Sequence, residues 1–365
     1  MKYLSEYRNL EATKHYLALI EKKITKPWKI MEICGGQTHS LVRNGILELL
    51  PKNVQMIHGP GCPVCVTPVS LIDKAVELLE KQAIVCSFGD MIRVPGSKKS
   101  LLQAKADGGD LRVLYSPLEA VNIAKQNPEK EVVFFAVGFE TTAPANALSV
   151  LHAEKENVRN FSILVSHVLV PPAMEAILAD EFCNIDAFLG AGHVCAIMGY
   201  EEYIPISVKF KTPIVITGFE PLDLVQGIYM AVCQLEAGEY KVENQYARVV
   251  KKEGNKAAMD VINKVFEVGS REWRGIGEIP NSGYRISKVY QDYDAELKFK
   301  ITKNEQVFNT KCIAGDILKG IKKPFECPVF GTECNPSNPL GAPMVSSEGA
   351  CAAYYHFSNN EKMTL

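Results

Sequence analysis

The sequence lacks any run of about 18 consecutive apolar residues, which is the shortest length typical of a membrane-spanning helix. Its first 23 residues are charged and amphipathic, without the apolar stretch of a secretory signal peptide. An excess of charge is also missing, because 40 Lys and Arg residues face 42 Asp and Glu residues and leave a net charge of −2. We therefore expect no membrane anchor and no nucleic-acid partner, and we predict a cytoplasmic protein.

The composition also lacks the bias of a disordered or fibrous chain. Apolar residues make up 47% and charged residues 22% of the sequence, and its 26 Gly and 20 Pro residues are spread along the chain. A length of 365 residues exceeds the usual size of one compact core. We expect a globular protein of two or three domains.

What the sequence does contain is a surplus of cysteine, with eleven residues in all. In a reducing compartment such a surplus indicates metal ligation or thiol chemistry rather than structural disulfides. Three of the cysteines, Cys86, Cys183 and Cys233, lie in apolar runs and are interpreted as packing residues.

Between residues 28 and 219, short apolar runs alternate with amphipathic stretches. This alternation is typical of βαβ units and predicts an α/β fold with parallel sheets, preceded by an N-terminal helix in residues 1–27. Two further helical stretches are expected at 222–236 and 255–268. The predicted strands are 29–33, 54–57, 83–86, 113–115, 132–137, 161–165, 186–189 and 213–217.

A helix is predicted directly after Cys65. Thr67 would cap it and Pro68 would occupy its first position, since proline suits a residue whose amide has no helical partner. Apolar residues recur at helical spacing and form one stripe, made of Leu71, Ile72, Ala75, Val76, Leu78 and Leu79.

A weak internal repeat divides the α/β region. Segment 32–38 aligns with 136–142 at an offset of 104, and Pro68 aligns with Pro171 at an offset of 103. Gly89-Asp90 likewise aligns with Gly192-His193. We hypothesise two similar parallel-sheet units, 28–134 and 135–235, that face a cleft, followed by a C-terminal helical and irregular module in 236–365.

Four cysteines lie in the irregular tail: Cys312, Cys327, Cys334 and Cys351. Four thiols in so short a segment can surround one tetrahedral ion or a cubane cluster, and the metal would then replace the core that the segment lacks. Structural zinc sites usually contain cysteines two to four residues apart, and this set has no such pair. The spacing favours an iron-sulfur cluster; zinc, or four unrelated buried thiols, are the alternatives.

A Cys-x-x-Cys pair, Cys62 and Cys65, follows a predicted strand and precedes a helix N-terminus. The free amides and positive dipole end of such a helix favour the thiolate, so the pair suits reversible disulfide chemistry. Half of a metal site, or two inert thiols, are the other interpretations.

Cys34 lies in the segment Glu32-Ile33-Cys34-Gly35-Gly36-Gln37-Thr38-His39, again at the carboxyl end of a strand. Because ligands bind beyond the carboxyl ends of parallel strands, Cys34 and the Cys62/Cys65 pair are expected to meet in space. Cys34 could act as a nucleophile or a soft metal ligand, and His39 could supply a proton. Alone, a cysteine before a Gly-Gly turn would more often be structural.

Weaker candidates follow other predicted strands: Asp90, Arg93, Glu140 and His193. Each could contribute a charge or a proton to the cleft. A solvated loop, a helix cap or an ordinary turn explains each of them about as well.

Six segments in the same order resemble the HypD family, whose members mature the iron centre of nickel-iron hydrogenases. They are EICGGQTH, GPGCPVC, SFGDMIRVPG, VGFETTAP, GAGHV and the terminal cysteine set. The resemblance implies that Cys312, Cys327, Cys334 and Cys351 hold a [4Fe-4S] cluster and that Cys62 and Cys65 are redox-active. It also implies that Cys34 helps to hold an iron ion that carries cyanide and carbonyl ligands.

The same resemblance implies two partners, a HypC-type chaperone that shares the iron and a HypE-type protein that delivers cyanide. We further predict that the tail packs close to the Cys62/Cys65 loop, so that the cluster can supply electrons to the pair. A stand-alone thiol-disulfide oxidoreductase and a passive scaffold with a structural metal are the alternatives. Cys34 distinguishes an iron-holding scaffold from a simple reductase, because the reductase needs no third thiol in a Gly-Gly turn.

Overall fold

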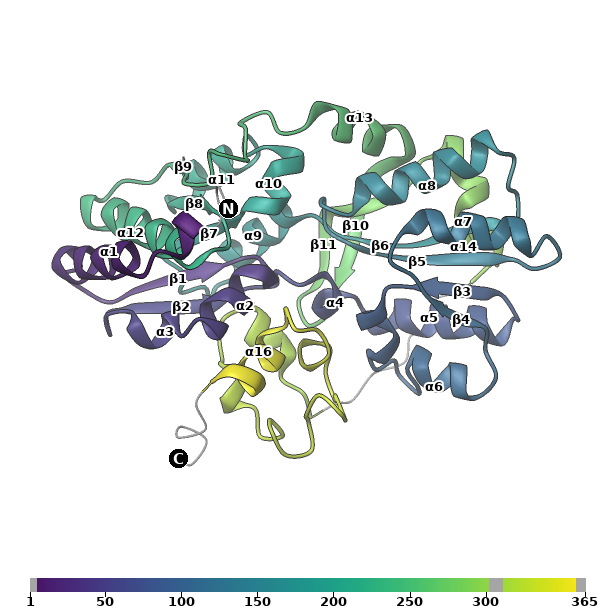
Figure 1. The fold of residues 1–365 in the computed structure, drawn as a ribbon, viewed down its shortest axis with the longest axis horizontal. Coiled ribbons are helices and arrows are strands. Elements are labelled where there is room, and N and C mark those ends of the chain that lie inside the picture. Colours follow the sequence, from purple (N-terminus) through teal and green to yellow (C-terminus); the bar gives the residue numbers. More distant parts are fainter. Residues whose placement is uncertain (1–4, 302–310, 359–365) are drawn as a thin grey trace.

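The structure, a computed structural model, describes residues 5–301 and 311–358. Two parallel sheets lie side by side with helices on their faces, and a C-terminal module lies below their junction (Figure 1). The predicted α/β class with parallel sheets is confirmed. None of the helices in the described residues is long and apolar enough to cross a membrane.

The first sheet has the order β2-β1-β7-β8-β9. Its strands are β1 (Trp28–Glu32), β2 (Val54–His58), β7 (Ala187–Ala191), β8 (Ile214–Thr217) and β9 (Val242–Asn244). One face packs against α1 (Leu10–Lys23), α2 (Gly35–Arg43), α3 (Ile46–Leu49) and α12 (Pro221–Ala237). The other packs against α9 (Val170–Ala179), α10 (Gly192–Met198) and α11 (Tyr203–Phe210).

The second sheet has the order β4-β3-β5-β6. Its strands are β3 (Ile84–Ser87), β4 (Leu111–Val113), β5 (Val132–Gly138) and β6 (Phe161–His167). Helices α5 (Val69–Glu80) and α6 (Leu101–Ala106) cover one face. Helices α7 (Pro117–Gln126), α8 (Ala143–Lys155) and α13 (Lys256–Val265) cover the other. Strand β5 is buried throughout because alternate side chains enter the two cores, Phe134 one and Phe135 the other.

The repeat is visible in the positions of the strands, but each sheet combines strands from both repeat units. An offset of 103 moves the first residues of β3 and β4 onto those of β7 and β8, and an offset of 104 moves the first residue of β1 onto that of β5. Under this correspondence the orders β2-β1-β7-β8 and β6-β5-β3-β4 are equivalent. Each sheet therefore takes one strand pair from the first unit and one from the second.

The division into units 28–134 and 135–235 consequently does not match the sheets, and its boundary falls inside β5. The chain leaves the first sheet after β2, builds the whole second sheet, and returns after β6. Parallel strands of either unit offer the same backbone hydrogen bonds, so the local sequence does not select the partner. The segment that makes the first crossing contains Cys62 and Cys65.

Two local predictions are corrected. The strand expected at 113–115 is β4, which ends at Val113, while Tyr115 is 93% exposed beyond it. Thr67 does not cap α5; it ends the short helix α4 (Pro63–Val66), and Pro68 is the residue that precedes α5. The apolar stripe of α5 is buried as predicted.

A β-hairpin that the sequence did not indicate follows α13. Its strands are β10 (Phe266–Trp273) and β11 (Gly277–Ile286), and β11 borders the end of β6 through a bridge between Val168 and Gly283. The remaining short elements are η1 (Ser5–Arg8), η2 (Gly89–Arg93), η3 (Lys288–Tyr293), α14 (Ala295–Lys298), α15 (Ala314–Leu318), η4 (Pro324–Glu326), η5 (Ala342–Met344) and α16 (Ala350–Phe357).

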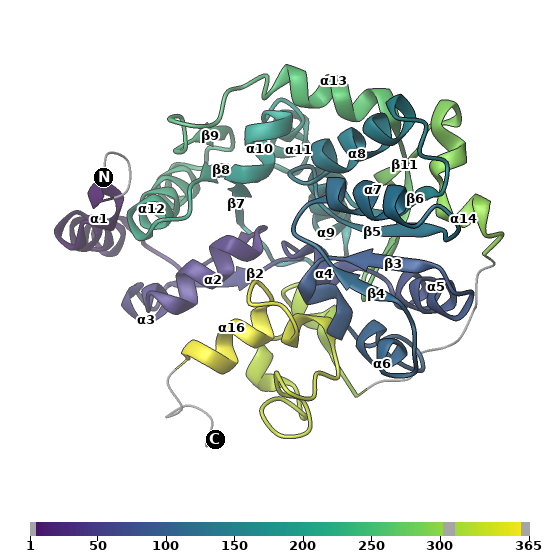
Figure 2. The same cartoon turned by 45° about the vertical axis from the view of Figure 1, so that its right-hand side comes forward.

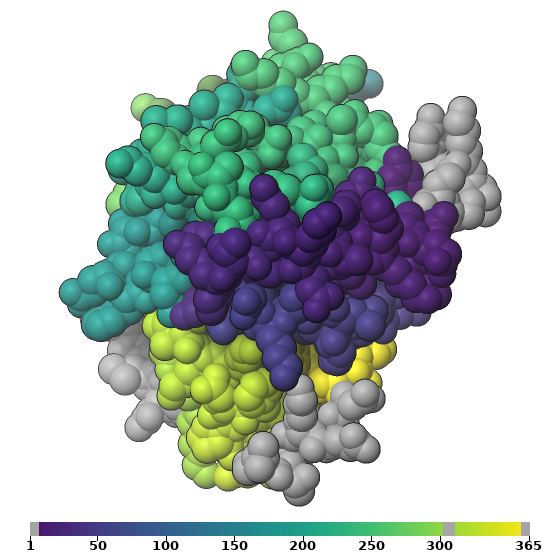
Figure 3. All heavy atoms as spheres, turned by 90° about the vertical axis from the view of Figure 1, so that its left-hand side faces the viewer, coloured from purple at the N-terminus to yellow at the C-terminus, as the bar shows by residue number. Residues whose placement is uncertain are grey.

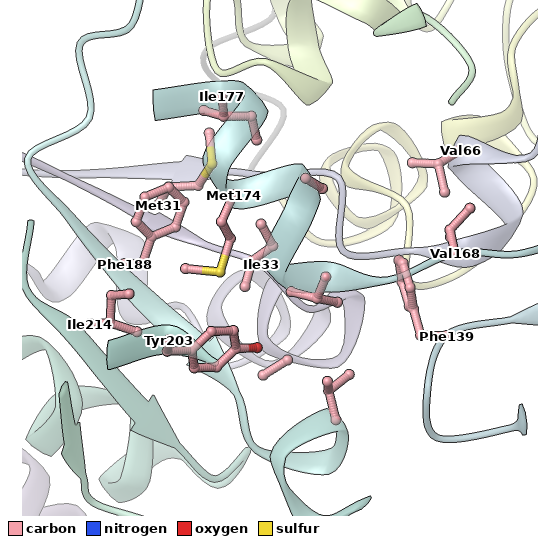
Figure 4. Packing of buried hydrophobic residues seen from close by; sticks show 14 of the residues in the cluster. Met31, Ile33, Val66, Phe139, Val168, Met174, Ile177, Phe188, Tyr203 and Ile214 are labelled. Carbon is pink, nitrogen blue, oxygen red and sulfur yellow. The ribbon is translucent and has the colours of Figure 1, made fainter. Parts of the chain in front are cut away.

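The two sheets share a core, so they form one body. Met31 and Phe188 of the first sheet belong to the same apolar cluster as Phe139, which follows β5, and Val66 of α4 (Figure 4). The turned view places α16 beside α2 and the C-terminal module beneath α4 (Figure 2). On the outer surface α1 lies across the part of the molecule that contains the first sheet. The C-terminal module, here residues 311–358, projects below it (Figure 3).

Candidate thiol and metal site

The loops that follow β1 and β2 meet at the carboxyl edge of the first sheet. The amide of Gly35 donates to the carbonyl of Gly61 (2.8 Å), and that of Gly59 donates to the carbonyl of Glu32 (2.9 Å). A Cβ on Gly61 would lie 2.3 Å from the backbone nitrogen of Cys34, so only glycine allows this approach. The structure thus brings Cys34 beside the Cys62 loop, although 28 residues separate them in the sequence.

The dithiol occupies α4, with Cys62 as its N-cap residue and Cys65 inside it. Both side chains are buried, and the Cys62 thiol acts on the acidity of Cys65. Burial, followed by the neighbouring Cys62, raises the pKa of Cys65 well above its usual value. The expectation that the helix favours a thiolate is therefore wrong for Cys65, because the helix has only four residues and Cys65 faces the core.

Cys34 is the N-cap residue of α2 and is also held as a neutral thiol. Burial and then the charge of Glu348 raise its pKa to about 12, against the opposing effect of the Gly36 and Gln37 amides. A thiol of this kind loses its proton when a cation arrives to balance the charge. Cys34 is chemically suited to bind a soft metal ion.

A buried hydrogen-bond chain links Cys34 to the C-terminal helix. The backbone amide of Cys34 donates to Glu32 Oε2 (3.0 Å), and His58 Nδ1 donates to Glu32 Oε1 (2.7 Å). His58 Nε2 then accepts from the hydroxyl of Tyr354 (3.1 Å). Thr38 also donates to Glu32. These bonds fix the Cys34 loop relative to α16, which carries Cys351.

The tail cysteines gather in the C-terminal module. Cys327, Cys334 and Cys351 are buried in one small apolar cluster. Burial first, and then the other three thiols, raise the pKa of Cys351, and burial raises that of Cys312 to about 11. Across the described residues, no group of three His, Cys, Asp or Glu side chains is compact enough to hold a single metal ion. In a cubane cluster each cysteine binds a different iron, so that group needs a wider arrangement of four thiols than a single ion does.

The C-terminal module packs directly on the Cys34 loop and on the dithiol helix. A Cβ on Gly35 would lie 2.6 Å from the Cβ of Glu348. The charges of Cys351 and Glu348 both contribute to the raised pKa of Cys65, and α4 contacts η5 of the module. The tail therefore lies against the Cys62/Cys65 loop, in the arrangement that we predicted.

Two of the weaker candidates, Asp90 and Arg93, lie at the same contact, as does His39. His39 Nδ1 donates to the carbonyl of Ser347 (3.0 Å), and Arg93 Nη2 donates to the carbonyl of Val345 (3.0 Å). The charge of Asp90 helps to raise the pKa of Glu348, after burial. His193 stacks on Phe219 with ring centroids 3.8 Å apart, and the Phe219 ring borders Gly36 beside Cys34.

Glu140 is a buried helix cap rather than a solvated loop residue, because its carboxyl binds the first backbone amide of α9. Its carboxyl is buried and accepts from the backbone amide of Val170 (3.0 Å). Burial raises its pKa to about 8. Its charge helps to raise the pKa of Cys195 and of Tyr203, and Cys34 also contributes to the raised pKa of Cys195. Glu140 thus lies behind the thiol site rather than in it.

Three residues at the site, His58, Glu348 and Tyr354, had no role predicted from the sequence. Two of them carried a usable signal. His58 is the residue directly before Gly59-Pro60-Gly61, and Glu348 is the one charged residue in the segment 341–350. Tyr354 carried none, because its partner lies 296 residues away in the sequence.

Comparison with known proteins identifies the family of this chain. The HypD family model, described as "Hydrogenase formation hypA family", matches residues 11–358. The chain is 46% identical over 368 residues to hydrogenase maturation factor HypD2 of Bradyrhizobium diazoefficiens, which covers 98% of this chain and 97% of the relative. It is 45% identical to HypD of Azotobacter vinelandii (100% and 99% covered) and 44% identical to HypD of Escherichia coli K12 (99% of each). A match of this extent shows that the chain belongs to the HypD family of hydrogenase maturation factors.

Proposed function

We propose that this protein is the scaffold on which the Fe(CN)2CO group of nickel-iron hydrogenase is assembled. In this proposal Cys34 binds the iron ion while cyanide and carbonyl ligands are attached. Both ligands require an electron-rich, low-spin iron, which a soft thiolate favours over oxygen donors. Membership of a family of hydrogenase maturation factors supports the proposal.

The surroundings of Cys34 suit a thiol that keeps its proton until one metal ion binds. The thiol is neutral without a cation, because its pKa is raised to about 12 by burial and by Glu348. His39 uses Nδ1 to bind a backbone carbonyl, which leaves Nε2 to accept a proton or to bind the iron. Glu348 can take up the proton that Cys34 releases, since burial raises its own pKa as well.

Cys312, Cys327, Cys334 and Cys351 would hold a [4Fe-4S] cluster in the C-terminal module. When bound, the cluster would supply electrons one at a time. The chain's own contribution is to enclose it, since three of these thiols are buried with apolar neighbours such as Val329. The single observation that carries the proposal is the packing of this module on α4. This packing brings Cys351 near enough to Cys65 to contribute to its raised pKa.

The dithiol would pass these electrons to the iron site. Cys62 and Cys65 are buried thiols of one short helix beside the Cys34 loop, a position suited to alternating between disulfide and dithiol. This placement favours the scaffold over a stand-alone oxidoreductase, because Cys34 belongs to the same set of loops. We further propose a cytoplasmic location, a HypC-type chaperone that shares the iron, and a HypE-type protein that donates cyanide.

Iron, zinc and acid-labile sulfide analysis of anaerobically purified protein tests the cluster. We expect about four iron and four sulfide per chain, the content of one [4Fe-4S] cluster. Cys312→Ala should lose them, whereas Cys183→Ala, outside the module, should retain them. One zinc per chain without sulfide would refute the electron supply.

Infrared spectroscopy of the protein copurified with its chaperone tests the iron site separately. The cyanide and carbonyl stretching bands should disappear in Cys34→Ser and remain in Cys183→Ser. Bands that persist in Cys34→Ser would place the iron elsewhere, even if the cluster is present.

A further inference from the structure

Arg274 lies in the turn between β10 and β11, where the hairpin reaches the dithiol segment. Its backbone amide donates to the carbonyl of Val66 (2.8 Å), one residue after Cys65. Its Nε donates to the carbonyl of Thr67 (2.8 Å), and its Nη2 donates to that of Pro95 (3.0 Å). The backbone bond fixes the turn against the end of α4, and the two side-chain bonds fix the guanidinium between Thr67 and Pro95.

The same turn touches the C-terminal module from its other side. A Cβ on Gly275 would lie 2.6 Å from the Cα of Gly315, so the two backbones are in close contact. Arg274 and Cys312 line one cavity of about 740 Å³, together with Gly275 and Gly315. The hairpin turn is thus inserted between the dithiol segment and the segment that carries the first tail cysteine.

The charge of Arg274 faces both groups of thiols. Burial lowers its pKa to about 10, and among the groups that oppose this shift Cys312 and Cys65 come first, before Asp73 and Glu272. Its side-chain hydrogen bonds go to uncharged carbonyl oxygens. At neutral pH the guanidinium is positively charged, and these carbonyl partners do not neutralise its charge as a hydrogen-bonded carboxylate would.

We propose that Arg274 is a positioning residue that holds a fixed positive charge between the Cys62/Cys65 dithiol and the tail-cysteine cluster. The inference rests on the proposed function, because it assigns this charge to the cluster and the dithiol that the function requires. One electron from a low-potential donor reduces the cluster, adds one negative charge and neither forms nor breaks a bond. A nearby cation stabilises this reduced form.

Arg274→Gln should therefore make the cluster harder to reduce. We expect the equilibrium constant for its reduction to fall about tenfold, which corresponds to a midpoint potential about 59 mV more negative for one electron. Arg274→Lys keeps the charge and should restore most of the wild-type potential. The measurement is a redox titration of the cluster-loaded protein, followed by the electron paramagnetic resonance signal of the reduced cluster.

Arg271 of the same hairpin provides the matched control. Its Nε and Nη2 donate to the carbonyl of Tyr284 (3.0 and 2.6 Å). Its charged neighbours are Glu296, Asp294 and Arg285 rather than cysteines. Arg271→Gln also removes a buried guanidinium, but it should leave the cluster potential unchanged.

Glu272→Gln tests the same charge balance without removing a buried side chain. Glu272 is exposed and binds Ser70 (3.0 Å), so the variant should fold normally. Removing a negative charge beside Arg274 should shift the cluster potential in the positive direction, by less than the Arg274→Gln shift because the site is exposed to solvent. This variant decides the matter if Arg274→Gln loses the cluster.

Iron and sulfide analysis of each sample distinguishes a failure of the proposed function from a failure of the inference about Arg274. A wild-type protein without a cluster would overturn the proposed function and this inference with it. A loaded cluster whose potential is the same in Arg274→Gln and Arg271→Gln would overturn the inference alone. Equal shifts in Arg274→Gln and Arg274→Lys would also overturn it, since they would indicate loss of packing rather than of charge. An unchanged or more negative potential in Glu272→Gln would do the same.

Discussion

Replacing Glu140 with glutamine should make the protein more stable at neutral and alkaline pH. The Glu140 carboxyl is 1% exposed, and burial raises its pKa from the usual 4.5 to about 8. Its ionised form is therefore disfavoured in the folded state and freely allowed in the unfolded state. Glutamine has the same shape, keeps an oxygen that can accept from Val170, and never ionises.

The magnitude follows from proton linkage. Below the unfolded pKa both states carry the proton, and Glu140 has no effect on the pH dependence. Between 4.5 and about 8 only the folded state keeps the proton, so the free energy of unfolding falls by about 1.36 kcal/mol per pH unit. The full loss is about 5 kcal/mol, reached above the folded pKa.

Urea unfolding of wild type and Glu140→Gln at a series of pH values from about 4 to 9 measures this loss. The difference between the two proteins should be small at the acid end and increase towards pH 8 in favour of the variant. Comparing the two at each pH cancels the contributions of other groups. Glu175→Gln is the control, because Glu175 forms only an exposed ion pair with Lys209 and should change little.

A constant difference across this pH range would refute the reasoning. It would mean that Glu140 is ionised in the folded protein, with a counter-charge or water beside it. A variant less stable than wild type at every pH would show instead that the proton of Glu140 makes a hydrogen bond that glutamine does not replace.

Three further predictions test the packing and electrostatics of the thiol site. Gly61→Ala should destabilise the protein by about 1–3 kcal/mol in urea unfolding, because its Cβ would overlap the Cys34 backbone, whereas Gly89→Ala, whose Cβ would meet its nearest atom at 3.7 Å, should not. Glu348→Gln should speed alkylation of Cys34 at mildly alkaline pH, measured by mass spectrometry, since it removes a charge that raises the Cys34 pKa; an unchanged rate would contradict this. Tyr354→Phe should lower the free energy of unfolding by about 1 kcal/mol through loss of its hydrogen bond to the buried histidine of β2, and an unaffected value would count against the chain that links α16 to Cys34.

The sequence predicted elements best where the chain is strongly patterned. Strand β5 is a continuous apolar run, β6 is mostly apolar, and α5 has one apolar stripe, so their positions were evident. The hairpin β10–β11 was missed because most of its residues are exposed or half-buried, and because Gly and Pro residues interrupt its second strand. Strand β4 was placed too late because Tyr115, a residue favoured in strands, lies exposed beyond its end.

The acidity of the thiols could not be read from local sequence. A Cys-x-x-Cys motif before a helix suggests a thiolate, but the helix α4 is short and Cys65 faces the shared core, so desolvation outweighs the helix dipole. The same applies to Glu140, whose burial depends on neighbours from α9, α10 and α11 rather than on its own loop.

The sequence by itself determined the α/β class, the positions of most strands along the chain and the three thiol groups at Cys34, Cys62/Cys65 and the tail. These follow from hydrophobic periodicity and from spacing, which are local properties. The tertiary structure alone decided that the repeated units exchange strand pairs and that the chain passes from the first sheet to the second in the segment that holds the dithiol. It also decided that Glu32 and His58 meet Tyr354. Such contacts join residues far apart in the chain, and they form because burial of both sheets in one core, not local preference, selects which strands and loops become neighbours.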